Sequence, residues 1–165
     1  MALTPAQQAT LKTAILADSA YNTLPANNGS ALFIANSLNT TFSPAFVVWK
    51  NAETIGNIGR AFNATELAGL STLNNTRLQT LAQYLADGVN PSLASIRQFF
   101  DDIFSGAGGV NTRAALLALW KRSPTATKLE KIFATGTGTD ASPATLGFEG
   151  TVSYIDIVQT MGWPY

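Results

Sequence analysis

Residues 88–122, GVNPSLASIRQFFDDIFSGAGGVNTRAALLALWKR, carry the strongest helical periodicity in this chain and its clearest stop signal. Apolar side chains recur there at three- and four-residue steps, which places them on one helix face that must be buried. These side chains are Leu93, Ile96, Phe99, Phe100, Ile103 and Phe104. Asn90 fits a helix cap and Pro91 the first helical residue after it. Arg97 and Asp101 are expected together on the opposite, solvated side.

The glycines from Gly106 to Gly109 are expected to end this helix, because glycine adopts left-handed backbone angles without a side-chain clash. A second helix is predicted from Asn111 or Thr112. Its inward side chains are Leu116, Leu117, Leu119 and Trp120. Two helices around a short glycine turn predict an antiparallel hairpin at the core of the fold.

The length and composition point to one helical domain over residues 1–165. A chain of 165 residues is long enough for a substantial core and too short to suggest two domains. Hydrophobic residues make up 46% and charged residues only 12%, about half the charged share of typical soluble domains. Charge is depleted from interface cores, so this composition favours a surface that partners cover. An ordinary monomer with a neutral polar surface is the alternative.

Several function classes are disfavoured by the residue types present. Ten basic and ten acidic residues balance, so no net field attracts nucleic acid or a membrane surface. The chain has no Cys and no His, which removes thiolate chemistry, the usual zinc ligands and the commonest general base. The adjacent Asp101 and Asp102 point in different directions on a helix and do not converge on a metal. We therefore expect no enzyme activity, no catalytic residue, no cofactor and no metal.

Localisation signals are also missing from the pattern. The N-terminal residues lack the basic and apolar regions of a signal peptide, and no window is apolar enough to span a bilayer. We therefore expect synthesis in a cytoplasm and no membrane partner.

The remaining segments predict a mainly α fold, a single-domain bundle of about six to eight short helices. Helices are expected from Thr4 to Asp18, over 31–38, over 63–86 with a break at 69–71, after Ser123, and after Ser153. Capping-box pairs fit three of these starts, namely Thr4 with Gln7, Asn63 with Glu66, and Ser153 with Asp156. Residues 46–49, FVVW, fit either a buried strand or a helix, and the preceding Ser-Pro pair favours helix. A minor β-ribbon is expected near residues 145–152.

The C-terminal third contains the candidate contact residues. The segment ATGTGTDASP, residues 134–143, is low in complexity and predicts a mobile loop at 134–145 unless a neighbour orders it. Thr137 and Thr139 in this loop, and Phe148 after it, are interface candidates. The short aromatic tail at 162–165 adds Trp163 and Tyr165. Either Trp163 folds back onto the domain, or these aromatic residues anchor a neighbouring subunit.

A concentration of basic residues lies in residues 113–131, with Glu130 as the one acidic residue among them. The basic residues are Arg113, Lys121, Arg122, Lys128 and Lys131. Lysine and arginine near a helix C-terminus interact favourably with the helix dipole, which already accounts for Lys121 and Arg122. The alternative interpretation is a basic rim that faces DNA or an acidic neighbour.

Three stretches of this sequence, TRAALLALWKRS, KLEKIFATGTGTDASPATLGFEGTVSY and SPAFVVWK, carry a resemblance. With them the chain resembles, over nearly its whole length, a family of small proteins encoded in the structural-gene modules of tailed bacteriophages and prophages. The resemblance implies a virion component of the neck or tail region, or a protein that helps to build it. It implies no catalytic residue.

The function expected from this resemblance is that of a non-enzymatic virion structural protein. Its place would be the head-to-tail connection or the tail, as a symmetric oligomer that contacts copies of itself and portal, connector or tail proteins. Its localisation would be the virion, after synthesis in the bacterial cytoplasm. One alternative is a cytoplasmic assembly chaperone or adaptor that is absent from the mature particle. The other is a small DNA-binding phage factor that uses the basic rim.

Overall fold

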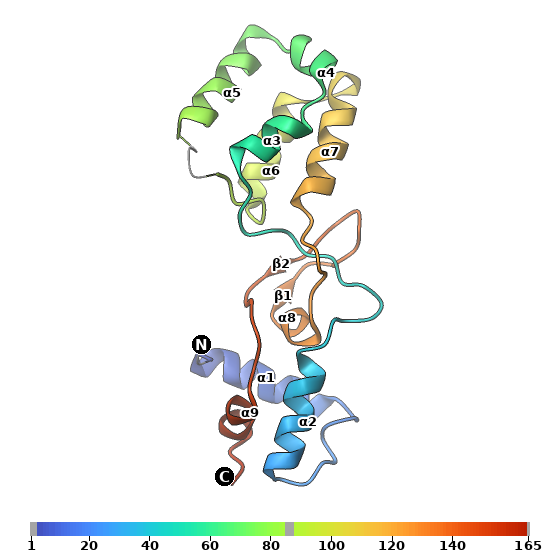
Figure 1. The fold of residues 1–165 in the computed structure, drawn as a ribbon, viewed down its shortest axis with the longest axis vertical. Coiled ribbons are helices and arrows are strands. Elements are labelled where there is room, and N and C mark those ends of the chain that lie inside the picture. Colours follow the sequence, from blue (N-terminus) through green and yellow to red (C-terminus); the bar gives the residue numbers. More distant parts are fainter. Residues whose placement is uncertain (1–2, 85–87, 165) are drawn as a thin grey trace. The chain divides into compact units, whose positions relative to one another are not determined.

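The computed structural model describes residues 3–84 and 88–164, and its chain forms two compact units (Figure 1). Unit 1 contains residues 1–48 and 124–165, and unit 2 contains residues 49–123. The chain therefore leaves unit 1, forms unit 2 and returns. The mainly helical class is confirmed, with a small antiparallel sheet near the C-terminus. That residues 1–165 act as a single domain stays a prediction.

Unit 1 joins helices from both ends of the chain. Its elements are α1 (Pro5–Ala17), α2 (Asn28–Leu38), α8 (Lys128–Ile132), β1 (Ala134–Thr135), β2 (Thr145–Leu146) and α9 (Tyr154–Met161). In Figure 1 the dark red α9 lies beside the blue α1 and α2, and α9 packs most extensively against α2. The core between them contains Leu11, Ile15, Ile34, Leu129 and Ile157, each almost fully buried.

The helix starts in unit 1 follow the local sequence. Thr4 and Gln7 form the predicted capping box at α1, and Ser153 and Asp156 form the predicted one at α9. Helix α8 begins at Lys128 with Thr127 as its cap, later than the start predicted at Ser123. That prediction was wrong because Thr127 and Glu130 form a capping box. The Thr127 hydroxyl accepts a hydrogen bond from the Glu130 N–H, and the Glu130 carboxylate accepts one from the Thr127 N–H.

The expected helix over residues 46–49 does not form. The backbone is extended there, and Val48 forms a bridge with Ala144. The Val47 N–H donates to the Gly138 carbonyl over 2.8 Å, and the Ala144 N–H donates to the Val47 carbonyl over 2.9 Å. A short apolar run fits either a strand or a helix, so contacts with residues more than 90 positions later in the chain decided its conformation.

Unit 2 surrounds the stretch from residue 88 to residue 122. Its elements are α3 (Ile55–Ala61), α4 (Ala64–Ala68), α5 (Thr72–Tyr84), α6 (Ala94–Ile103), the 3-10 turn η1 (Ala107–Gly109) and α7 (Val110–Trp120). The predicted break at 69–71 separates α4 from α5, and the predicted end of that helix at Ala86 lies outside the described residues. Phe100, Phe104, Leu116 and Trp120 are buried together, and the Phe100 and Trp120 rings lie 5.4 Å apart. The shared core of the two helices is therefore confirmed.

The start of α6 differs from the prediction. The helix begins at Ala94, because the Asn90 side chain closes a turn onto the Ser92 N–H at 2.9 Å and does not cap a helix. Leu93 is consequently 51% exposed. Arg97 was expected on the solvated side with Asp101, but it donates to the Pro91 carbonyl over 2.6 Å and covers the Trp49 ring. The guanidinium thus exchanges water for the carbonyl acceptors of Pro91 and Ser92, and gains the aromatic face of Trp49.

The predicted glycine turn after α6 is confirmed, and one of its glycines is required by close packing. A Cβ at Gly109 would overlap the carbonyl group of Phe104, which also accepts a hydrogen bond from Arg113. A Cβ at Gly108 would meet no atom within 4 Å. The two neighbouring glycines therefore differ in what a methyl group would disturb.

Gly109→Ala is expected to lower the free energy of unfolding of unit 2 by about 2 kcal/mol or more, because the end of α6 must move away from the new methyl group. Gly108→Ala is the matched control, with an expected change within about 0.5 kcal/mol. Urea unfolding measures both variants, followed by Trp49 and Trp120 fluorescence in a Trp163→Phe background. Equal effects of the two substitutions would contradict the packing argument.

Candidate functional site

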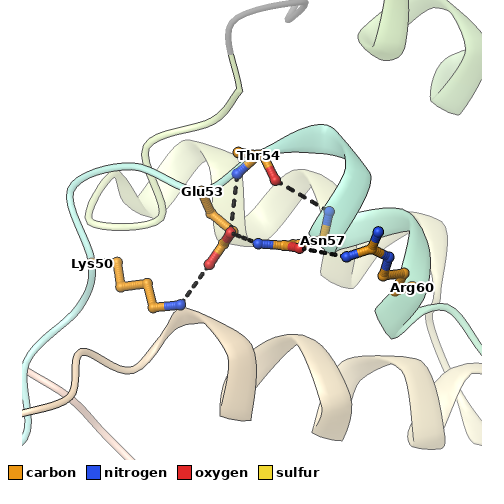
Figure 2. A network of polar contacts seen from close by, with 5 residues as sticks. All are labelled: Lys50, Glu53, Thr54, Asn57 and Arg60. Carbon is orange, nitrogen blue, oxygen red and sulfur yellow. Dashed lines mark hydrogen bonds and ion pairs between the residues drawn. The ribbon is translucent and has the colours of Figure 1, made fainter.

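Glu53 is a buried carboxylate at the centre of a polar network at the start of α3 (Figure 2). Its side chain accepts hydrogen bonds from Lys50 Nζ at 2.6 Å, the Thr54 N–H at 3.0 Å and Asn57 Nδ2 at 2.7 Å. Arg60 extends the network by donating to Asn57 Oδ1 over 3.3 Å. A buried carboxylate with three donors is well satisfied, as burial of charge requires.

The backbone of Glu53 also connects two segments of unit 2. Glu53 and Val89 exchange both of their N–H to carbonyl hydrogen bonds, each 2.8 Å long. Gly88, with φ of 105°, packs against this pair of hydrogen bonds, and a Cβ at Gly88 would overlap the Glu53 carbonyl. Glu53 therefore attaches the segment before α3 to the segment before α6 by its main chain and stabilises the start of α3 by its side chain.

Glu66 makes a second connection, between α4 and α7. Its Oε1 accepts the Asn111 N–H and Asn111 Nδ2, both at 2.9 Å, and its Oε2 accepts the Thr112 N–H at 2.7 Å. In return, the Thr112 hydroxyl accepts the Asn63 N–H at 3.0 Å. A carboxylate at the free N–H groups of a first turn satisfies donors that have no partner within the helix, and its charge favours the dipole.

The sequence predicted only part of this arrangement. Asn63 caps α4 as expected, accepting from the N–H groups of Thr65 and Glu66. The Glu66 side chain, however, does not return to the Asn63 backbone to complete a capping box. It reaches α7, 45 residues later, because α7 has no side-chain cap of its own.

The electrostatics of both carboxylates favour the ionised form. For Glu53, burial raises the pKa, but the hydrogen bonds from Lys50, Asn57 and Thr54 and the charge of Lys50 lower it by more, so its pKa lies below the ordinary value of a glutamate. For Glu66, burial likewise raises the pKa, and the hydrogen bonds from Thr112 and Asn111 lower it by more, so its pKa also lies below the ordinary value. A carboxylate with a lowered pKa is a weak general base near neutrality. Both side chains are suited to holding unit 2 together.

Unit 2 is therefore expected to lose stability in acid. A carboxylate whose pKa is lower in the folded state stabilises the fold above its unfolded pKa, and this contribution is lost as the pH falls through the folded pKa. Glu53→Gln and Glu66→Gln should each lower stability at pH 7 and flatten its decline below about pH 5. Urea unfolding across pH 7 to 3, followed by fluorescence as for the glycine variants, measures the slopes. Asp102→Asn, which removes an exposed carboxylate of α6, is the control, and equal flattening by it would contradict the assignment.

The interface candidates of the C-terminal third lie in unit 1. Thr137 and Thr139 are exposed in the turn between β1 and β2, where Thr137 Oγ1 donates to the Ser142 carbonyl over 3.0 Å and Thr139 exchanges backbone hydrogen bonds with Ser142. Phe148 is half-buried and packs against Phe133, with ring centroids 5.3 Å apart. The loop thus has a defined hairpin conformation, and its mobility stays a prediction.

The aromatic tail begins at Gly162, which ends α9 in a left-handed conformation with φ of 71°. Trp163 follows, and its N–H donates to the Val158 carbonyl over 3.0 Å. Its half-buried side chain packs against the core of unit 1, as in the alternative in which the tail folds back. Tyr165 lies outside the described residues. A contact of either aromatic residue with a neighbour stays a prediction.

The five residues of the predicted basic rim belong to different units. Arg113, Lys121 and Arg122 lie in unit 2, whereas Lys128 and Lys131 lie in unit 1. Arg113 donates to the Phe104 carbonyl, within unit 2. Lys128 Nζ donates to Ser37 Oγ over 3.1 Å, within unit 1. A continuous basic surface is therefore not established by these positions, and contact with DNA stays a prediction.

Sequence reasoning missed an exposed apolar surface on unit 1. Leu32 and Phe33 of α2 are 50% and 55% exposed, and Tyr154 and Ile155 of α9 are 39% and 41% exposed. Leu32 and Tyr154 line one shallow groove together with Asn28 and Gly29. The signal in the sequence was the absence of any charged residue between Asp18 and Lys50. A group of large exposed apolar side chains, two of which line a groove, is typical of interaction surfaces.

The described residues contain no group of three or more acidic, His or Cys side chains placed to hold a metal. Within the same part of the chain, no helix combines the length and apolar character needed to cross a membrane. Comparison of the chain with protein-family models, with curated proteins and with solved structures finds no match.

Proposed function

We propose that this protein is a non-enzymatic structural protein of a tailed-bacteriophage virion, located at the head-to-tail connection or in the tail, and that it assembles as a symmetric oligomer. The observation that carries the proposal is the apolar surface of Leu32, Phe33, Tyr154 and Ile155 on α2 and α9. The resemblance of the sequence to small phage structural-module proteins supplies the biological setting.

The charge distribution supports the use of unit 1 for assembly. Unit 1 contains three basic and five acidic residues, whereas the shorter unit 2 contains seven basic and five acidic residues. Unit 1 therefore combines the lower charge density with the exposed apolar side chains of α2 and α9. Association of such surfaces removes apolar area from water and desolvates few charges.

The buried carboxylates support a structural role in a different way. Glu53 and Glu66 are each held by several hydrogen-bond donors that belong to helix starts and connecting segments. Their lowered pKa values keep them ionised in these contacts. These hydrogen bonds thus hold the helices of unit 2 in one arrangement. A subunit that repeats in a symmetric assembly needs such a fixed arrangement.

The apolar surface is expected to be necessary for self-association. Leu32→Ser and Phe33→Ser should each weaken oligomer formation by about three- to tenfold, because full burial of such a side chain contributes roughly 1.5–3 kcal/mol and about half of each is still exposed. Leu73→Ser is the matched control, since Leu73 is 61% exposed on α5 of unit 2. Light scattering coupled to size-exclusion chromatography measures the molar mass across a concentration series. A monomeric wild type, or equal weakening by Leu73→Ser, would oppose assembly through α2 and α9.

The virion role is tested by quantitative mass spectrometry of purified particles. The protein is expected at a fixed copy number relative to the major capsid protein, in a value compatible with a closed ring. Absence from clean particles, with the protein present in infected-cell lysate, would overturn the virion role and favour the assembly chaperone. Salt-sensitive retention on duplex DNA would instead favour the DNA-binding factor.

A further inference from the structure

Unit 1 contains a pocket that the proposed function does not use. It lies between α1, the end of α2 and α8, and has a volume of about 330 Å³. This is at the lower end of the range of small-ligand pockets. Its apolar wall is formed by Ile15, Leu38, Phe42 and Ile132. A compact apolar group would be removed from water there.

Two lysines of α8 give the same pocket a positive wall. Lys128 and Lys131 are three residues apart, so they lie on one helix face, and both are half-buried. The aliphatic stem of a lysine packs readily against apolar surface while its ammonium group stays accessible. Among residues 3–84 and 88–164, no carboxylate lies within ion-pair distance of either ammonium group.

Both ammonium groups are held in place by uncharged partners. Lys131 Nζ lies 3.5 Å from the centroid of the Phe42 ring, which is the pocket wall. Lys128 Nζ donates to Ser37 Oγ over 3.1 Å, and Ser37 Oγ also pairs with the Tyr21 hydroxyl at 2.9 Å. Each ammonium has three donors, so these contacts leave capacity for an anionic acceptor.

One carboxylate also lines the pocket. Asp18 is exposed, and its Oδ1 accepts the Ala20 N–H over 2.8 Å. It reduces the positive charge of the pocket wall from two to one. The pocket therefore retains a net attraction for an anion, and Asp18 weakens that attraction.

We propose that this pocket binds a small apolar group that bears a carboxylate. The apolar part lies against Ile15, Leu38 and Ile132, and the carboxylate accepts hydrogen bonds from Lys128 and Lys131. The same chemistry is offered by a free aliphatic acid and by an acidic side chain beside an apolar residue of another protein. The proposal is independent of the virion role, because it concerns the isolated chain.

The test uses hexanoate and its uncharged counterpart hexanamide as probes. Titration of the full ¹⁵N-labelled chain is followed by amide chemical shifts. Hexanoate is expected to shift the signals of residues 14–21 and 128–132, and hexanamide to bind about tenfold more weakly, because a hydrogen bond to a charged group contributes roughly 1.5–3 kcal/mol. No binding of hexanoate, or equal binding of the two probes, would overturn the proposal. This comparison needs no variant.

Four variants locate the site. Lys128→Met and Lys131→Met are each expected to weaken hexanoate binding by about three- to tenfold, and Asp18→Asn to strengthen it about twofold. Lys12→Met is the matched control, since Lys12 is exposed on α1 and does not line the pocket, and no change is expected. Equal weakening by Lys12→Met would overturn the assignment to this pocket.

A further titration, with a peptide, distinguishes the two sources of the carboxylate. The blocked tripeptide acetyl-Leu-Glu-Phe-amide is titrated beside its Leu-Gln-Phe counterpart. Tighter binding of the Glu peptide than of hexanoate, with loss on Glu→Gln exchange, supports the pocket and identifies a protein segment as its ligand. Tighter binding of hexanoate supports the pocket and identifies a free acid.

Discussion

The ionised carboxylate of Glu66 at the start of α7 is the interaction on which unit 2 most depends. The first turn of any helix has N–H groups without an intrahelical partner, and burial makes them costly unless an acceptor is supplied. Helix α7 has no side-chain cap of its own, and Thr112 in its first turn is fully buried. Glu66 supplies the acceptors from α4, so the position of α4 determines whether α7 can be buried.

The same principle recurs at two other places in this chain. Glu53 satisfies the start of α3, and in unit 1 the Asn39 amide exchanges hydrogen bonds of 2.8 and 3.0 Å with the backbone of Val152, just before α9. Each connection joins elements that the sequence separates, except at α3, where the donors are local. A chain with 12% charged residues thus uses some of its few charges inside the fold.

Local signals explain which predictions were confirmed. The capping boxes at Thr4 and Ser153 involve residues three positions apart, so the geometry is complete within one turn and needs no tertiary partner. The burial of Phe100 and Trp120 followed from helical period and side-chain size. The pocket of Lys128 and Lys131 could not be predicted, because its wall combines α8 with residues more than 80 positions earlier in the chain.

By itself, the sequence determined the helical class, the glycine turn after α6 and the burial of most of the large apolar side chains of α6 and α7, because these depend on period, capping and backbone freedom over a few residues. Only the tertiary structure decided that residues 46–49 are extended, that Arg97 covers Trp49 and that Glu66 serves α7. These outcomes depend on which distant groups lie within hydrogen-bonding or van der Waals distance. The local sequence does not contain that information, because a short apolar run or a single polar side chain is compatible with several different partners.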